Sequence, residues 1–139
     1  MFKFQIILTI SCWMLASCHP DKYYTLFKIK NNSDKPIYYT YSNKYPDTSV
    51  DHSIYIPPGS TRTPGEIINP NSNLSIVKSA PIEDYFKTIP SDTIEIFIYD
   101  ANVVKSSPWD SVVTKYLILK RYDLTLDNIN KMDRIIVYP

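Results

Sequence analysis

Hydrophobic and polar residues alternate along several short stretches of the chain, and this pattern predicts β-strands. The clearest stretch is 92–99, in which isoleucine occupies every second position from 94 to 98. A period of two places successive side chains on opposite faces of a strand. Shorter stretches rich in β-branched and aromatic residues predict the remaining strands. These lie at 23–30, 37–42, 54–56, 116–122 and 134–138, and 66–68 and 74–77 are two weaker candidates.

Turn-forming residues separate the first two predicted strands. The segment 31–36 reads Asn-Asn-Ser-Asp-Lys-Pro, a composition typical of turns. We therefore expect 23–30 and 37–42 to pair as an antiparallel hairpin with a six-residue loop. Strict alternation in the first strand predicts Phe27 on one face and Leu26 on the other.

Three short helices are predicted between the strands. The first begins with Ser79 as its cap, continues through Pro81 and two acidic residues, and ends before Pro90. A Ser-Pro-Trp-Asp sequence beginning at Ser107 predicts the second helix. Thr125 is expected to cap the third, because apolar residues follow it at helical spacing.

The amino terminus predicts a secretion signal over residues 1–17. Lys3 precedes a largely apolar stretch, 4–16, that is too short for a bilayer core, which needs about 20 residues. The stretch leads into the sequence Leu-Ala-Ser-Cys, which ends at Cys18 and resembles the lipobox of bacterial lipoproteins. In that class of protein the signal is cut before the cysteine and the thiol is diacylated. We therefore expect Cys18 to carry lipid and 18–22 to tether the domain.

Two other interpretations of this terminus are open. A plain secretory signal cut near Ala16 would leave an exposed thiol at Cys18, and a short membrane anchor would need a longer apolar run. A lipid at Cys18 predicts an outer-membrane lipoprotein of the cell envelope that faces the periplasm or the cell surface. Several acyl chains, at about 0.8 kcal/mol per buried methylene, make such attachment effectively permanent.

Six or seven short strands with two or three short helices predict a mainly β fold, an antiparallel β-sandwich. A partly open barrel is the alternative. The chain has 139 residues, and removing residues 1–17 leaves 122, close to the commonest size of one domain. We therefore expect 23–139 to form a single sandwich-like domain.

The composition excludes several classes of function. Only two glycines are present, too few for the glycine-rich loops that bind dinucleotides or phosphates. The 15 basic and 14 acidic residues become 14 and 14 when Lys3 leaves with the signal, and the scattered cations argue against nucleic-acid binding. Cys12 lies in the signal and Cys18 carries the lipid, so the mature domain has no thiol for a disulfide.

Residues suited to catalysis or metal binding are few. His52 shares a polar loop with Asp47 and Asp51, but this set is too small for a zinc site and its spacing does not match a calcium loop. The chain has no Gly-x-Ser-x-Gly sequence and no free thiol to act as a nucleophile. We therefore predict no catalytic residues, no metal and no cofactor.

Two charged residues on predicted strands are expected to have structural roles. Glu95 would shift its pKa or find a partner if its face were buried, and would pair with a neighbouring Lys or Arg if that face were partly wet. The partly wet face is the favoured prediction. Arg121 is expected to form an internal salt bridge or hydrogen-bonded corner with Asp123 or Asp100.

The chain contains 12 tyrosines, many for its length. Strands favour tyrosine in any case, and alternation sends Tyr39 and Tyr41 toward the core. Tyrosines on the opposite face or in loops are candidates for an exposed patch, because flat aromatic rings stack on sugars and bury area cheaply at protein interfaces. The candidates for this binding patch are Tyr38, Tyr45, Tyr55 and Trp109.

Two segments resemble a known group of proteins. One runs from 31 to 47 and includes Tyr-Pro-Asp; the other runs from 92 to 139 and ends in Tyr-Pro. Its most specific part is Lys120-Arg121-Tyr122-Asp123-Leu124-Thr125. Together with the lipobox these segments resemble small uncharacterised lipoproteins of Bacteroidota. The resemblance implies an envelope localisation and a shared fold, and no activity comes with it.

Three functions fit these features. The leading one is a non-enzymatic envelope module, tethered to the membrane at Cys18, that binds a protein or glycan. The second is a structural or assembly subunit of an envelope complex. The third is a hydrolase with an unfamiliar site that uses His52 or Glu95, and it is the least favoured.

Overall fold

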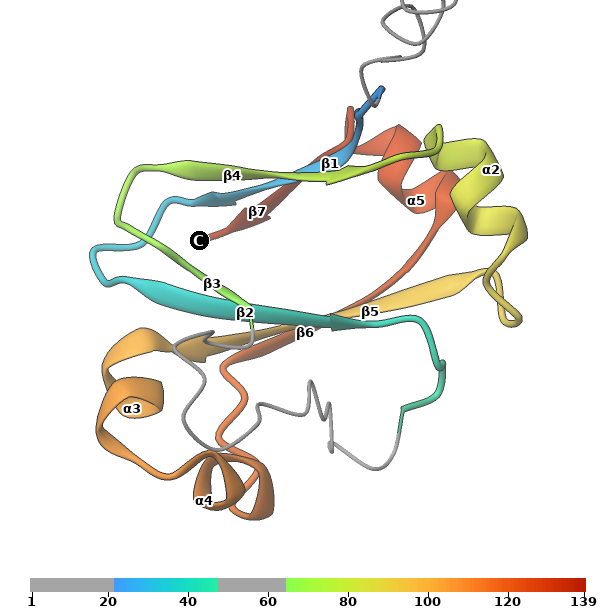
Figure 1. Ribbon diagram of the computed structural model, residues 1–139. Helices are drawn as coiled ribbons and strands as arrows, with labels where there is room; N and C mark the ends of the chain where they lie inside the picture. Colours follow the sequence, from blue (N-terminus) through green and yellow to red (C-terminus); the bar gives the residue numbers. More distant parts are fainter. Residues whose placement is uncertain (1–21, 48–64) are drawn as a thin grey trace, which may run out of the picture.

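The computed structural model describes residues 22–47 and 65–139, and in them seven strands form two sheets packed face to face (Figure 1). Sheet A has the strand order β4-β1-β7 and sheet B the order β3-β2-β5-β6. The strands are β1 (Tyr24–Asn31), β2 (Ile37–Ser42), β3 (Glu66–Ile68), β4 (Asn73–Lys78), β5 (Thr93–Asp100), β6 (Lys120–Thr125) and β7 (Ile135–Tyr138). The predicted sandwich is confirmed.

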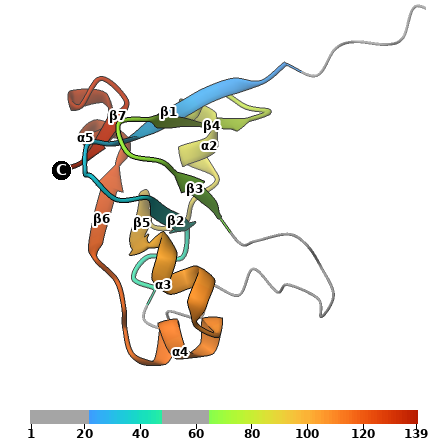
Figure 2. The same ribbon diagram turned by 90° about the vertical axis from the view of Figure 1, so that its left-hand side faces the viewer.

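Four short helices accompany the sheets in the described part of the chain, one more than the upper end of the prediction. They are α2 (Ile82–Lys87), α3 (Ala101–Ser106), α4 (Trp109–Thr114) and α5 (Leu126–Lys131). Helices α2 and α5 lie together at one end of the sandwich, whereas α3 and α4 lie on the side of sheet B that faces away from sheet A (Figures 1 and 2).

The main core lies between the inner faces of the two sheets. Strand β5 supplies Ile94, Ile96 and Ile98 to it, and Ile29 and Ile136 of sheet A face them. At about 25 cal/mol per Å² of buried apolar surface, this layer is the largest source of stability in the domain. The strand predicted at 92–99 is therefore confirmed as β5, an inner strand of sheet B.

The predicted hairpin of β1 and β2 is wrong, because the two strands belong to different sheets. Strand β1 pairs with β4 and β7, and β2 pairs with β3 and β5. The turn between them carries the chain from sheet A to sheet B. Asn31 holds this crossing: its buried side-chain amide donates to the carbonyls of Lys35 (2.8 Å) and Ile68 (3.0 Å). Turn composition predicted a reversal but could not show which sheet the second strand joins.

Strand β1 also departs from strict alternation. A bulge between Thr25 and Phe27 shifts its register with β4. One extra residue in a bulged strand re-aims the neighbouring side chains. As a result Leu26 and Phe27 are both buried in the main core, although they were expected on opposite faces.

The three predicted helices are present near their expected positions, but their caps are only partly as predicted. Helix α2 begins after Pro81, and neither Ser79 nor another side chain caps it. Helix α3 was not predicted, although the Asp100 carboxylate accepts hydrogen bonds from the backbone of its first turn. Thr125 caps α5 as predicted, in a reciprocal pair of hydrogen bonds with Asn128.

Strand β6 begins four residues later than predicted. Tyr116 has a positive φ of 50°, which an extended strand cannot accommodate. The final strand is confirmed as β7, and it runs parallel to β1. The predicted strand 54–56, the signal 1–17 and Cys18 lie outside the described residues, as do His52 and Tyr55. None of the described helices has the length and hydropathy to span a bilayer.

Candidate functional site

The outer face of sheet B carries the most unusual chemistry in the described part of the chain. Strand pairing places Ser42, Glu95 and Asp123 side by side on β2, β5 and β6. The neighbouring row on the same face, two residues further along β5, contains Phe97 and Arg121. This polar half of the face is not an arrangement that any one strand reveals, because three strands from distant parts of the sequence meet in it.

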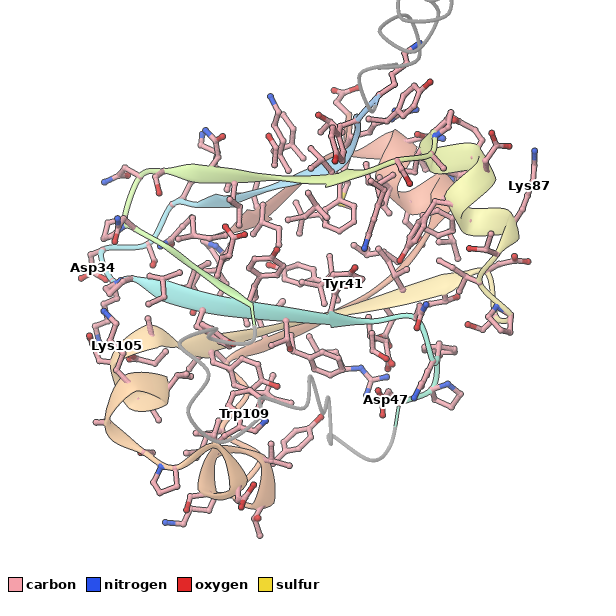
Figure 3. All side chains as sticks on the ribbon, viewed as in Figure 1. Asp34, Tyr41, Asp47, Lys87, Lys105 and Trp109 are labelled. Carbon is pink, nitrogen blue, oxygen red and sulfur yellow. The ribbon has the colours of Figure 1, made fainter. Side chains whose placement is uncertain are left out.

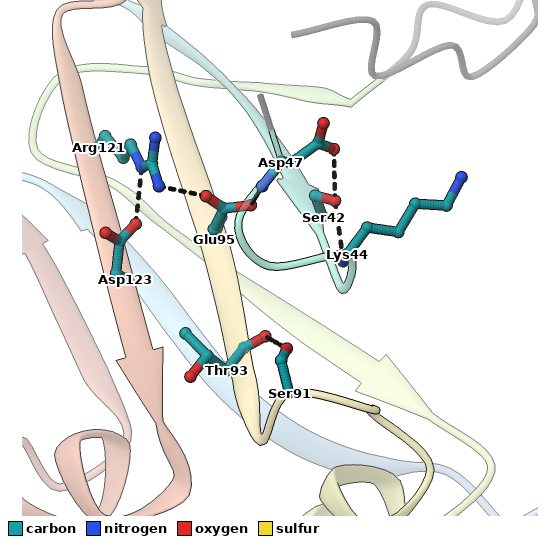
Figure 4. Close-up of polar contacts among 8 residues, drawn as sticks. All are labelled: Ser42, Lys44, Asp47, Ser91, Thr93, Glu95, Arg121 and Asp123. Atoms are coloured by element: carbon teal, nitrogen blue, oxygen red, sulfur yellow. Dashed lines mark hydrogen bonds and ion pairs between the residues drawn. The ribbon is translucent and has the colours of Figure 1, made fainter. Parts of the chain in front are cut away.

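Glu95 is the charged centre of this row. Its residue is 0% exposed, so Glu95 itself is not in contact with water. The predicted pairing with a neighbouring Lys or Arg is confirmed, and the side chains of Arg121 and Asp123 on the same face are 31% and 41% exposed. One carboxylate oxygen forms an ion pair with Arg121. The other accepts a hydrogen bond from the backbone N–H of Asp47, at 2.8 Å (Figure 4). A buried carboxylate persists only when it is paired and hydrogen-bonded, and Glu95 has its ion pair at one oxygen and its hydrogen bond at the other.

Arg121 connects Glu95 to the edge of the sheet. Its Nε donates to Asp123 at 2.7 Å, and its guanidinium lies 5.8 Å from the centre of the Phe97 ring. The hydrogen bond with Asp123, together with the attraction of Glu95, raises the pKa of Arg121 above its ordinary value. The predicted bridge to Asp123 is confirmed, whereas Asp100 caps α3 instead.

The same network holds the turn that follows β2. The buried Asp47 side chain accepts a hydrogen bond of 2.7 Å from the Ser42 hydroxyl, which itself accepts one from the backbone N–H of Lys44. Because Glu95 also binds the Asp47 backbone, this turn is fastened to the sheet at both ends (Figure 4). The arrangement therefore acts as a structural clamp, which we call the Glu95 clamp: Ser42, Asp47, Glu95, Arg121 and Asp123.

The Glu95 clamp does not have the features of a general acid or base. A carboxylate used in proton transfer needs an oxygen that substrate can reach, and both oxygens of Glu95 are engaged by Arg121 and Asp47. A hollow of about 280 Å³ lies beside the crossing turn, and its lining includes neither Glu95 nor Arg121. Within 22–47 and 65–139, no three His, Cys, Asp or Glu side chains are placed to hold a metal ion.

The aromatic half of the same face corrects the predicted binding patch. Tyr38 points away from the main core, as expected, but it is 0% exposed because α3 and α4 cover it. Trp109 lies between sheet B and these helices (Figure 3), with its ring centre 6.0 Å from that of Tyr38 and 5.4 Å from that of Tyr99. Tyr38 and Trp109 therefore form a second core and are not an exposed patch.

The remaining patch candidates are Tyr45 and Tyr55. Tyr45 is exposed in the turn after β2, and Tyr55 lies outside the described residues. Tyr39 is buried in the main core, and Tyr41 lies between the sheets, packed against that core (Figure 3). The two-residue period placed these tyrosines on the correct faces, but it could not show that helices distant in sequence would cover one of those faces.

Alkaline titration should expose the burial of Tyr39 and Tyr99. Burial raises the pKa of each phenol from its ordinary 10.0 to about 12. In the unfolded chain the same phenols lose their protons near pH 10, whereas in the folded domain they keep them until about pH 12. The free energy of unfolding therefore has its full value below pH 10 and falls as the pH rises from 10 to 12. Two pKa units correspond to about 2–3 kcal/mol for each phenol. Denaturant unfolding at a series of pH values, with tyrosinate absorbance recorded in parallel, measures the loss.

The matched control for this titration is the double variant Tyr39→Phe/Tyr99→Phe. Without the two phenols, the stability should fall less steeply between pH 10 and 12. An unchanged pH dependence in the variant would assign the alkaline transition to other groups.

An exposed apolar segment was missed by sequence reasoning. Tyr116, Leu117 and Leu119 are 54%, 37% and 51% exposed and link α4 to β6. The aromatic and β-branched content of 116–122 led to the prediction of a strand here. The one usable signal was the apolar content of a stretch that follows a helix and precedes a charged strand.

No protein-family model, curated protein or solved structure matches the chain.

Proposed function

We propose that the chain is a lipoprotein of the cell envelope, anchored through Cys18, whose β-sandwich is a non-catalytic module that binds a protein partner. The Leu-Ala-Ser-Cys sequence at the end of an apolar stretch supports the anchor. The first described strand begins at Tyr24, so a short tether joins the lipid site to the folded domain.

The observation that carries the binding function is the exposed segment Tyr116, Leu117 and Leu119. Large apolar side chains that stay exposed together on a folded domain are typical of interaction surfaces. Leu119 also donates its backbone N–H to Ile98, so the end of the segment is fixed to sheet B. A surface that is already ordered loses little conformational freedom when a partner binds.

A protein partner is favoured over a glycan. Sugar binding by stacking needs exposed flat rings. Tyr38 and Trp109 are instead packed against each other in the second core, and the exposed segment offers one ring, Tyr116, beside two leucines. A binding role is favoured over hydrolysis because Arg121 and Asp47 engage both oxygens of Glu95. A permanent partner would make the chain an assembly subunit, and a transient one would make it a receptor-like module.

The anchor is tested by replacing Cys18. In cells, Cys18→Ala should release the protein from the membrane fraction or leave it as an uncleaved precursor, because no acyl chains are attached. Cys12→Ala is the matched control, since Cys12 lies within the signal and its loss should leave membrane attachment unchanged. Membrane fractionation with a size shift on gels gives the answer. Mature Cys18→Ala protein that stays with membranes like the wild type would refute the anchor.

The binding surface is tested by site-specific photo-crosslinking. A photoreactive amino acid at Leu119 should give discrete adducts with one protein in intact cells, whereas the same group at Lys105, exposed on α3, should not. A partner that co-purifies with the protein without irradiation would identify an assembly subunit. Identical adduct patterns from both positions, or none from either, would contradict the proposed surface.

A further inference from the structure

The outer face of sheet A is uncovered by any described element. Strand pairing aligns its side chains in rows across the three strands, with Lys28 between Ser75 and Ile135, and Lys30 between Asn73 and Val137. All of these residues are exposed. None of the described helices lies over this side of the sheet (Figures 1 and 2), whereas α3 and α4 cover the outer side of sheet B.

The charged side chains on this face are all basic, and aliphatic side chains lie beside them. Strands β1, β4 and β7 contain no aspartate or glutamate, and β1, the central strand, carries Lys28 and Lys30 outward. Three aliphatic side chains flank them: Val77, Ile135 and Val137 are 49%, 40% and 42% exposed. Lysines among exposed aliphatic residues suit a surface that offers negative charge at its outside and hydrocarbon beneath.

Acidic residues near this face are mostly neutralised by their own partners. At the α2–α5 end, Glu83 pairs with Arg134, and Asp127 with Lys131. Asp84 likewise pairs with Lys87 on α2. These pairs reduce the repulsion that a nearby anionic surface would otherwise meet at this end of the domain.

The tether connects directly to this sheet. Cys18 lies four residues before Lys22, the first described residue, and β1 begins two residues later. Four residues span at most about 14 Å when fully extended. An anchor at Cys18 would therefore hold the central strand of sheet A close to the bilayer surface, at a high effective concentration of lipid headgroups.

We propose that sheet A lies against the anionic phospholipid surface to which Cys18 is anchored, with Lys28 and Lys30 at the phosphates and the three aliphatic side chains at headgroup level. This inference rests on the proposed function, because it uses the lipid anchor. Sheet B and the segment Tyr116, Leu117 and Leu119 then face away from the membrane, toward a partner. The anchor alone would leave the domain free to rotate, and docking of sheet A gives it one orientation.

The experiment uses the lipidated protein reconstituted into vesicles, with one thiol introduced for a fluorescent label. The mature chain offers no other free thiol, since Cys12 is removed and Cys18 is acylated. Ser75→Cys places the probe on the outer face of sheet A, and Ser106→Cys places a matched probe at the end of α3. Quenching by lipids that carry a quencher on the headgroup reports which face lies near the bilayer.

In vesicles containing phosphatidylglycerol, the Ser75 probe should be quenched strongly and the Ser106 probe weakly. Lys28→Gln/Lys30→Gln should weaken the docked state roughly fivefold for each lysine removed. Lys105→Gln/Lys115→Gln, an equal change of charge among exposed residues of the sheet B side, should have no effect. Pure phosphatidylcholine vesicles should reduce the Ser75 quenching as the lysine variant does.

The outcomes separate the two proposals. If the protein does not float with vesicles, or floats equally well when Cys18 is replaced by alanine, the anchor is overturned and the docking with it. Protein that floats but shows equal quenching at Ser75 and Ser106 overturns the docking alone. Shielding of Ser75 that depends on protein density and not on phosphatidylglycerol would assign the face to a second copy of the chain, which also overturns the docking.

Discussion

Replacing Arg121 with methionine is expected to destabilise the fold by about 3–5 kcal/mol, because it leaves the Glu95 carboxylate buried without its counter-charge. Glu95 is 0% exposed, and without Arg121 its carboxylate keeps only the hydrogen bond from the Asp47 backbone N–H, which carries no full counter-charge. Methionine keeps the apolar stem that packs near Phe97. Urea unfolding followed by far-ultraviolet circular dichroism measures the loss. Domains of this size have a total stability of about 5–15 kcal/mol, so the effect is large.

Arg134→Met is the matched control for this prediction. Arg134 pairs with Glu83 at 3.0 Å, but both side chains are about half exposed, and such pairs contribute about 0–1 kcal/mol. Adding Glu95→Gln to Arg121→Met should recover much of the loss, since the buried charge is then gone. If the two arginine variants lost the same amount of stability, the Glu95 clamp would not have the stabilising role predicted for it.

Trp109→Ala is the other substitution expected to have a large effect, at about 3 kcal/mol. Trp109 is half-buried and fills the space between α4, Tyr38 and Tyr99, so truncation opens a cavity in the second core. If Trp109 belonged to an exposed binding patch, the same change would weaken binding and leave stability nearly intact. Thermal unfolding of the wild type and the variant distinguishes these outcomes directly.

Two tyrosine variants serve as controls. Tyr38→Phe keeps the ring and removes only a hydroxyl that has no hydrogen-bond partner among the described residues, so its effect should lie within about 1 kcal/mol of zero. Tyr45→Ala changes an exposed ring in a turn and should change stability by about 0.5 kcal/mol or less. A Tyr45 effect as large as that of Trp109 would contradict the assignment of Trp109 to a core.

Sheet B links these effects to the proposed function. Its strand β5 is buried on both faces, between the main core on one side and the Glu95 clamp and the second core on the other. The Glu95 clamp and the second core therefore hold β6 and α4 in place, and these two elements flank the segment Tyr116, Leu117 and Leu119. Loss of either should reduce partner crosslinking only to the extent that it unfolds the domain, whereas changes at Leu119 should reduce crosslinking without unfolding.

Local pattern was sufficient for much of the strand content. The run 92–99, the final strand and the Thr125 cap depend on neighbours along the chain, and the structure confirms all three. The lipobox-like sequence at Cys18 is equally local, and it stays a prediction because it lies outside the described residues. These features were accessible because side-chain periodicity and capping act over only a few residues.

Only the tertiary structure decided which strands pair, which faces are covered and what surrounds Glu95. Alternation placed Tyr38 away from the main core, but two helices more than sixty residues later bury it. Asn31 begins a turn in either topology, and its bonds to Lys35 and Ile68 are made only when that turn crosses between sheets. The Glu95 clamp needs β2, β5 and β6 side by side. Such contacts depend on the packing of the whole sandwich. The free energy of that packing comes from residues far apart in the sequence, so no single stretch of residues predicts it.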